Sequence, residues 1–224
     1  SVGAYLTFRF NNMAGYDLNL QQSAGAAARN IVVEYNQLRD LNITNSNHIT
    51  VIGNKARQLY FTSAVTIKVN SNIINCPYNG LGNDIRGILL SKCTDASCSF
   101  NTITVYGNFR AKGVEISNSS AISCTNNTIK SYAYQVHSMG VHVNGKDSRA
   151  IRISGNDIVS SYCYNIYENS MTKYGIYADN GDSIYISNNH IQGLAHDREG
   201  IGIALYNILD VVEADSNTVQ DFKT

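Results

Sequence analysis

The sequence is poor in charge, tryptophan and proline, and neither sign of charge is in excess. Only 15% of its 224 residues are charged, too few for a surface built of charged helices. Lysine plus arginine equals aspartate plus glutamate at 17 each, so the basic stripe of a nucleic-acid-binding protein is missing. No apolar run approaches the ~20 residues that a membrane helix needs. We therefore expect no nucleic-acid partner and no membrane insertion.

Asparagine, glycine and tyrosine are abundant instead, at 28, 17 and 15 residues. Asparagine and glycine favour tight turns, so their abundance predicts a β protein whose chain turns often. The chain is long enough to bury a substantial core.

The five cysteines do not suggest a disulfide framework or a metal site. Their number is odd and no pair has metal-ligand spacing. Cys98 and Cys124 occupy equivalent inward positions, which predicts small buried core residues. A bridge between Cys93 and Cys98 is the less favoured alternative. We expect no metal and no other cofactor.

A phrase repeats along the chain. "SIYISNNHIQG" (183–193) closely resembles "AIRISGNDIVS" (150–160), with alternating apolar residues before an asparagine and another apolar residue two positions after it. Successive copies are 26 to 33 residues apart. The asparagines of this column are Asn72, Asn101, Asn127, Asn156, Asn189 and Asn217.

A second phrase, in which glycine precedes an apolar–x–apolar triplet, lies upstream of each later asparagine. Its copies begin at Gly87, Gly113, Gly140, Gly175 and Gly200, and Gln58 begins an equivalent segment. The first repeat is ambiguous, because both Asn36 and Asn47 fit the asparagine column. Spacing favours Asn47, and residues 30–33 then become the upstream strand.

Each repeat predicts short strands joined by turns, with one face of each strand inward. Such a unit cannot close a core alone, but stacked copies can, with the asparagines forming an amide ladder. We therefore predict an all-β solenoid of about seven coils over residues 30–224. Residues 1–29 are expected to form a degenerate coil or cap, with a short helix over residues 21–29, and the chain is expected to be a fragment of a longer one. A propeller or a leucine-rich repeat fits the period and columns less well.

The pattern G-I-x-I…I-x-I-x-x-N-x-I resembles the repeat of right-handed single-stranded parallel β-helix proteins. These include pectate lyases, polygalacturonases, alginate epimerases and phage tailspikes. The resemblance covers about residues 30–219 and implies a polysaccharide groove on the outer face of the glycine-phrase strand and the loops before it.

The outward column of this strand predicts a line of Glu115, His142 and Tyr177. Candidate catalytic residues are Glu115, His142, Tyr177, Asp197 and Glu199, and candidate substrate-binding residues are Tyr60, Asp84, Arg86, Arg110 and Lys112. Glycoside hydrolysis needs two carboxyl groups, whereas elimination from a uronate needs a base and a cation. The alternative is that Glu115 and His142 form an ordinary solvated pair.

The leading functional hypothesis is a polysaccharide depolymerase like a phage tailspike. It implies a homotrimer located outside the cell or on a virion, with secretion or cell-surface display as the alternative. A non-catalytic fibre segment or glycan-binding adhesin, and a uronate lyase or epimerase, remain open.

Overall fold

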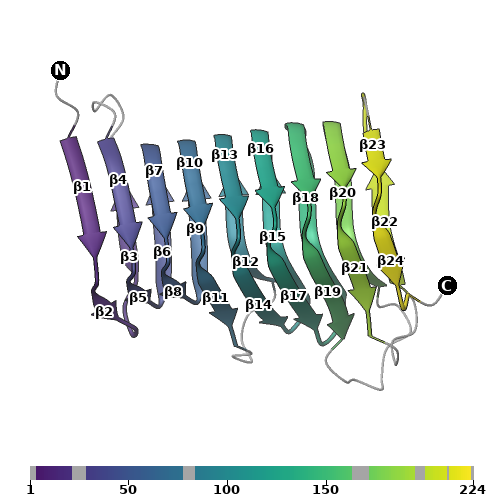
Figure 1. Ribbon diagram of the computed structural model, residues 1–224, viewed down its shortest axis with the longest axis horizontal. Coiled ribbons are helices and arrows are strands. Elements are labelled where there is room, and N and C mark those ends of the chain that lie inside the picture. The colour runs from purple at the N-terminus through teal and green to yellow at the C-terminus, as the bar shows by residue number, and fades with distance from the viewer. Residues whose placement is uncertain are drawn as a thin grey trace.

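The computed structural model describes residues 4–21, 29–77, 84–162, 172–194, 200–210 and 212–222. These residues form short strands that wind into a parallel β-helix, with β1 and the last strands at opposite ends of its long axis (Figure 1). Helices long and apolar enough to span a membrane do not occur in this part of the chain. The predicted fold class is confirmed.

Three parallel sheets form the walls of the helix, numbered here in the order in which the chain enters them. Sheet 1 contains β1 (Ala4–Arg9), β4 (Arg29–Glu34), β7 (Asn47–Ile52), β10 (Val65–Asn70), β13 (Thr94–Ser99), β16 (Ser120–Thr125) and β23 (Val212–Asp215). Sheet 2 contains β2 (Asn12–Met13), β5 (Gln37–Leu38), β8 (Lys55–Ala56), β11 (Ile73–Cys76), β14 (Thr102–Gly107), β17 (Thr128–Ala133), β19 (Asp157–Tyr162), β21 (His190–Gly193) and β24 (Thr218–Gln220). Sheet 3 contains β3 (Leu18–Gln21), β6 (Asp40–Thr44), β9 (Gln58–Thr62), β12 (Asp84–Ser91), β15 (Arg110–Ser117) and β22 (Gly200–Tyr206).

Two long strands, β18 (His137–Ser154) and β20 (Thr172–Ser187), begin in sheet 3 and continue into sheet 1. Counting each of them in both sheets, the described strands make eight coils, and β23 and β24 begin a ninth. The first coil, β1 to β3, pairs in register with the second. The helix predicted over residues 21–29 falls almost entirely outside the described residues.

Columns of β-branched residues fill the interior. In sheet 2, Ile74, Ile103, Ile129, Ile158 and Ile191 are paired in register and are all fully buried. β-Branched side chains pack well on a pleated surface, and period-two alternation sends every second one inward. The interior is a single apolar cluster that runs along the coils.

The predicted amide ladder is present at the corner between sheets 1 and 2. Asn101 shows the pattern: its backbone N–H and its Nδ2 both donate to Oδ1 of Asn127 at 3.0 Å. Its Nδ2 also donates to the carbonyl of Val69 at 3.0 Å. The preceding residue, Phe100, has a φ of 55°, a left-handed conformation that turns the chain. The buried amide thus satisfies backbone groups that the turn would leave unpaired.

The ladder corrects the prediction for the first repeats. Asn36 belongs to it and Asn47 does not: Asn47 is the first residue of β7 and pairs with Val65. A further member, Asn54, lies 18 residues from both Asn36 and Asn72. Spacing misled the prediction because a coil with two-residue strands in sheet 2 closes in only 18 residues.

Two register predictions for sheet 3 are also wrong. Residues 30–33 lie in β4 of sheet 1, so it is Asn42 that pairs with Tyr60 in sheet 3. At the other end, Ala204 pairs with Tyr177, so the last glycine phrase begins at Gly202 and not at Gly200.

The cysteines lie where the columns predict. Cys98 pairs with Cys124, and both are fully buried. Cys76, Cys93, Cys98 and Cys124 are free, so no bridge joins Cys93 to Cys98. Cys163 lies outside the described residues.

Candidate functional site

The outer face of sheet 3 carries its side chains in columns across the coils. Glu115 pairs with His142, and His142 pairs with Tyr177. On its other side Glu115 pairs with Leu89, and Leu89 pairs with Tyr60. Neighbours in such a column are separated by ~4.8 Å, so the predicted line of Glu115, His142 and Tyr177 is present.

A glycine in each of the later strands of sheet 3, from β12 onward, brings a second column onto the same face. Lys112 and Glu115 are three positions apart, which would place them on opposite faces of a regular strand. Gly113 lies between them, and a Cβ there would collide with Ile129 and lie 2.6 Å from the carbonyl oxygen of Gly140. Only glycine allows this close approach, and the irregularity lets Lys112 and Glu115 contact each other on the outside.

Glu115 is the centre of a buried ionic cluster, because its side chain is only 5% exposed. Lys112 Nζ donates to Glu115 Oε1 at 2.8 Å, and Asn144 Nδ2 donates to the same oxygen at 2.8 Å. Arg86 contacts the other carboxylate oxygen through Nε. Lys112, Asn144 and Arg86 therefore all act as donors to this carboxylate.

These contacts keep Glu115 ionised. Burial alone would raise the pKa of Glu115. Hydrogen bonds from His142 and Lys112, the charge of Lys112 and the contact with Arg86 outweigh burial, and the pKa of Glu115 lies well below its ordinary value. Glu115 is thus an anion that can hold a neighbour in place, and it is not a proton donor.

His142 lies against this anion. Its Nδ1 lies 3.3 Å from Glu115 Oε1 and 3.3 Å from Asn144 Nδ2. Burial lowers the pKa of His142 against the opposing effect of its hydrogen bond to Glu115, so the ring is neutral near pH 7. In the tautomer that carries its proton on Nδ1, next to Glu115, Nε2 can accept a proton.

Aromatic rings adjoin His142 on the next coils. The Tyr177 ring lies 5.3 Å from the His142 ring, centroid to centroid. Tyr174 and Tyr206 lie 4.7 Å and 5.6 Å from the Tyr177 ring. Burial raises the pKa of Tyr177, helped by the charge of Asp179, so its phenol stays protonated and can donate.

The predicted substrate-binding residues gather on the other side of Glu115. Asp84 Oδ2 lies 3.5 Å from Arg110 NH1, 3.9 Å from Lys112 Nζ and 4.0 Å from Arg86 NH2. The side chain of Arg110 is 46% exposed, whereas that of Lys112 is 6% exposed. Three cations thus face two carboxylates, Asp84 and Glu115, which leaves this cluster one positive charge, presented to solvent by Arg110.

Tyr60 borders the same cluster beside Arg86. Burial raises the pKa of Tyr60 to about 12, so it is a neutral hydrogen-bonding group. The remaining candidates, Asp197 and Glu199, lie outside the described residues.

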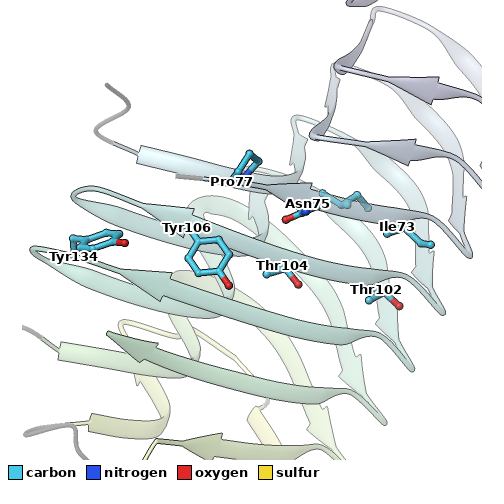
Figure 2. A pocket seen from close by; sticks show the side chains of 8 residues that line it. Ile73, Asn75, Pro77, Thr102, Thr104, Tyr106 and Tyr134 are labelled. Carbon is cyan, nitrogen blue, oxygen red and sulfur yellow. The ribbon is translucent and has the colours of Figure 1, made fainter. Parts of the chain in front are cut away.

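Sequence reasoning missed several neighbours of the site. Asn144 follows His142 by two positions and therefore lies on the same face of the strand, a signal that was available. Tyr206 comes from the same column as Asn144, next to the predicted line. A shallow groove on the outer face of sheet 2, shown in Figure 2, was not expected at all.

Comparison with known proteins supports the fold. No protein-family model matches the sequence, and no curated protein matches it. Among solved structures, the chain is similar to the A-module of the mannuronan C-5 epimerase AlgE6 from Azotobacter vinelandii, with a TM-score of 0.53 and 15% sequence identity. The match covers 97% of this chain and 57% of the other, so the chain spans little more than half of that structure.

Proposed function

We propose that this protein is a carbohydrate-active β-helix that binds an acidic polysaccharide across sheet 3 and abstracts a proton from a uronate residue. One observation carries the proposal: neutral His142, oriented by ionised Glu115, lies beside the protonated phenol of Tyr177. A base and an acid are thus adjacent at one edge of a cationic cluster. The structurally similar A-module belongs to an enzyme that acts on a uronate polymer.

The proposed chemistry uses each group once. Nε2 of His142 takes the proton from the ring carbon that bears the carboxylate, and Arg110, the exposed cation of the cluster, offsets the negative charge that develops there. In elimination, the bond from the adjacent carbon to the glycosidic oxygen breaks, a carbon–carbon double bond forms, and Tyr177 protonates the departing oxygen. In epimerisation, Tyr177 instead returns a proton to the opposite face of the same carbon.

Hydrolysis fits the described residues less well. It needs a carboxylic acid that protonates the leaving group and a second carboxylate. Glu115 is ionised, and both of its oxygens are occupied by donors. We therefore favour proton abstraction over hydrolysis. The tailspike depolymerase, the homotrimer and the location outside the cell or on a virion remain predictions.

The test is incubation with polymannuronate, polyguluronate, polygalacturonate and neutral dextran. Unsaturated uronate absorbance would indicate elimination, and deuterium uptake from heavy water without chain shortening would indicate epimerisation. New reducing ends without unsaturation would indicate hydrolysis and overturn the proposed chemistry. Binding without any of these changes would mean an adhesin.

Replacing the base should separate these outcomes. We expect His142→Gln to lower turnover of the acidic polymer by ~100-fold or more, the usual contribution of a general base. His190→Gln is the matched control, since His190 also pairs with a carboxylate, Asp157 at 2.9 Å, but is exposed on sheet 2. Equal turnover by the wild type and both variants would remove His142 from the mechanism.

A further inference from the structure

The groove on sheet 2 is a second concave surface, separate from the charged cluster on sheet 3. It has a volume of about 560 Å³, within the range of ligand sites. It lies across β11 and β14 and reaches Tyr134, just after the end of β17, with Tyr106 and Tyr134 towards one end and Ile73 and Thr102 towards the other (Figure 2). Its remaining lining residues are Ile74, Asn75, Pro77 and Thr104.

The side chains of the groove suit a sugar. The Tyr106 ring stacks on Tyr132 of the next coil, with centroids 4.9 Å apart and planes 14° apart, so Tyr132 covers one face of the Tyr106 ring and holds that ring beside the groove. Thr102, Thr104 and Asn75 add hydroxyl and amide groups, and Thr102 and Asn75 are exposed. Flat aromatic faces beside neutral hydrogen-bonding groups match the C–H faces and hydroxyls of a pyranose ring.

The charge at the edge of the groove favours an acidic glycan. No charged side chain lines the groove within the described part of the chain. Beside it, Lys130 of β17 is exposed and pairs with Thr104, so it stands one coil from the groove floor. A uronate whose ring lies on the groove can place its carboxylate towards Lys130.

The groove and the site on sheet 3 lie on either side of one corner of the helix, a few residues apart along the chain. Tyr106 is four residues before Arg110, and Tyr134 is three residues before His137, which pairs with Arg110. The two corner turns are joined by backbone hydrogen bonds, from Tyr134 N to the Gly107 carbonyl and from Val136 N to the Phe109 carbonyl, both at 3.0 Å. A four-residue segment spans at most ~14 Å. An extended polysaccharide can therefore cross this corner and touch both surfaces.

We infer that the groove lined by Tyr106, Thr104 and Tyr134 is an accessory subsite that holds further sugars of the acidic polysaccharide bound on sheet 3. This inference rests on the proposed function, because it names the same ligand. The subsite makes affinity depend on chain length: short oligosaccharides occupy sheet 3 alone, and longer ones also reach sheet 2.

The test measures binding and turnover of oligomannuronates and oligogalacturonates, from disaccharides to chains long enough to cross the corner. We expect Tyr106→Ala and Tyr134→Ala to weaken binding of the long chains by about tenfold, the effect of one lost aromatic contact, with no change for disaccharides. Tyr185→Ala is the matched control, because Tyr185 lies on the outer face of sheet 1 against Arg152. Thr104→Trp fills the groove from an outward position and should act like the tyrosine variants without removing their packing.

The outcomes separate the two proposals. Length-dependent binding that needs Tyr106, with no turnover of any uronate, would retain the subsite and overturn the proposed function. Turnover that needs His142, with unchanged long-chain affinity in all groove variants, would overturn the subsite alone. If the wild type binds none of these acidic glycans, both are overturned.

Discussion

Burial raises the pKa of Glu115, whereas ion pairing and hydrogen bonds lower it by more. Because the pKa of Glu115 is lower in the folded protein than in the unfolded chain, ionisation of this group stabilises the fold. That stabilisation is complete above the ordinary glutamate pKa of ~4.3, and it is lost as the pH falls from there towards the folded-state value.

We expect Glu115→Gln to lower the free energy of unfolding at neutral pH by about 3 kcal/mol, because it leaves Lys112 and Arg86 beside a neutral group in a buried cluster. The difference from the wild type should shrink as the pH falls below ~4.3. Urea unfolding across this pH range measures it, with Glu213→Gln on the exposed face of sheet 1 as control. Equal neutral-pH stability of the wild type and Glu115→Gln would contradict the role of the cluster.

The alternation of the sequence correctly placed Glu115, His142 and Tyr177 in one outward line. It did not foresee that Glu115 is buried. Alternation predicts on which face of the sheet a side chain lies, but it does not predict whether neighbouring side chains bury it. Here the cover comes from Arg86 and Lys112, which reach the same face only because of the glycine irregularity.

Among the elements, the asparagine corner should be the least tolerant of substitution. Asn127→Ala would leave the Asn101 amide and the Cys98 carbonyl without their buried partners. We expect a loss of about 3 kcal/mol, since each unsatisfied buried group costs about 1–3 kcal/mol.

Asn75→Ala removes an amide of the same type from the exposed face of β11 and serves as the control. Its effect should stay within ~0.5 kcal/mol. Chemical denaturation of both variants measures the difference. Similar losses for the two would mean that the ladder adds no more than any surface asparagine.

The repeat columns predicted the strands and their stacking, because packing residues recur once per coil. They could not assign the first coils, where Asn36 and Asn54 are only 18 residues apart and the glycine phrase is absent. They also could not reveal the groove on sheet 2. Its residues belong to three different coils, and their proximity follows from register and not from any local pattern.

For the molecule as a whole, the packed interior should protect the thiols. Burial raises the pKa of Cys93 to about 11 and also raises that of Cys76, so these two thiols stay protonated. All four described cysteines are buried and therefore inaccessible. We expect at most one rapidly reacting thiol in the native protein and all five after unfolding without reductant. Titration with a thiol reagent measures this. A count near three after unfolding would reveal a disulfide.

The corners of this helix differ in the freedom that they leave for inserted residues. Only Ser71 and Asn72 separate β10 from β11, and only Asn126 and Asn127 separate β16 from β17. Between sheets 2 and 3 the chain instead passes from Ala56 to Gln58 through one residue, but from Cys76 to Asp84 through a longer segment. The rise from coil to coil is thus fixed by strand pairing, while the connection from sheet 2 to sheet 3 can vary in length. Residues inserted at this corner lengthen one coil without changing the register of the others. Binding loops could therefore diversify at this corner, or be grafted there by design, while the stacking of the coils stays the same.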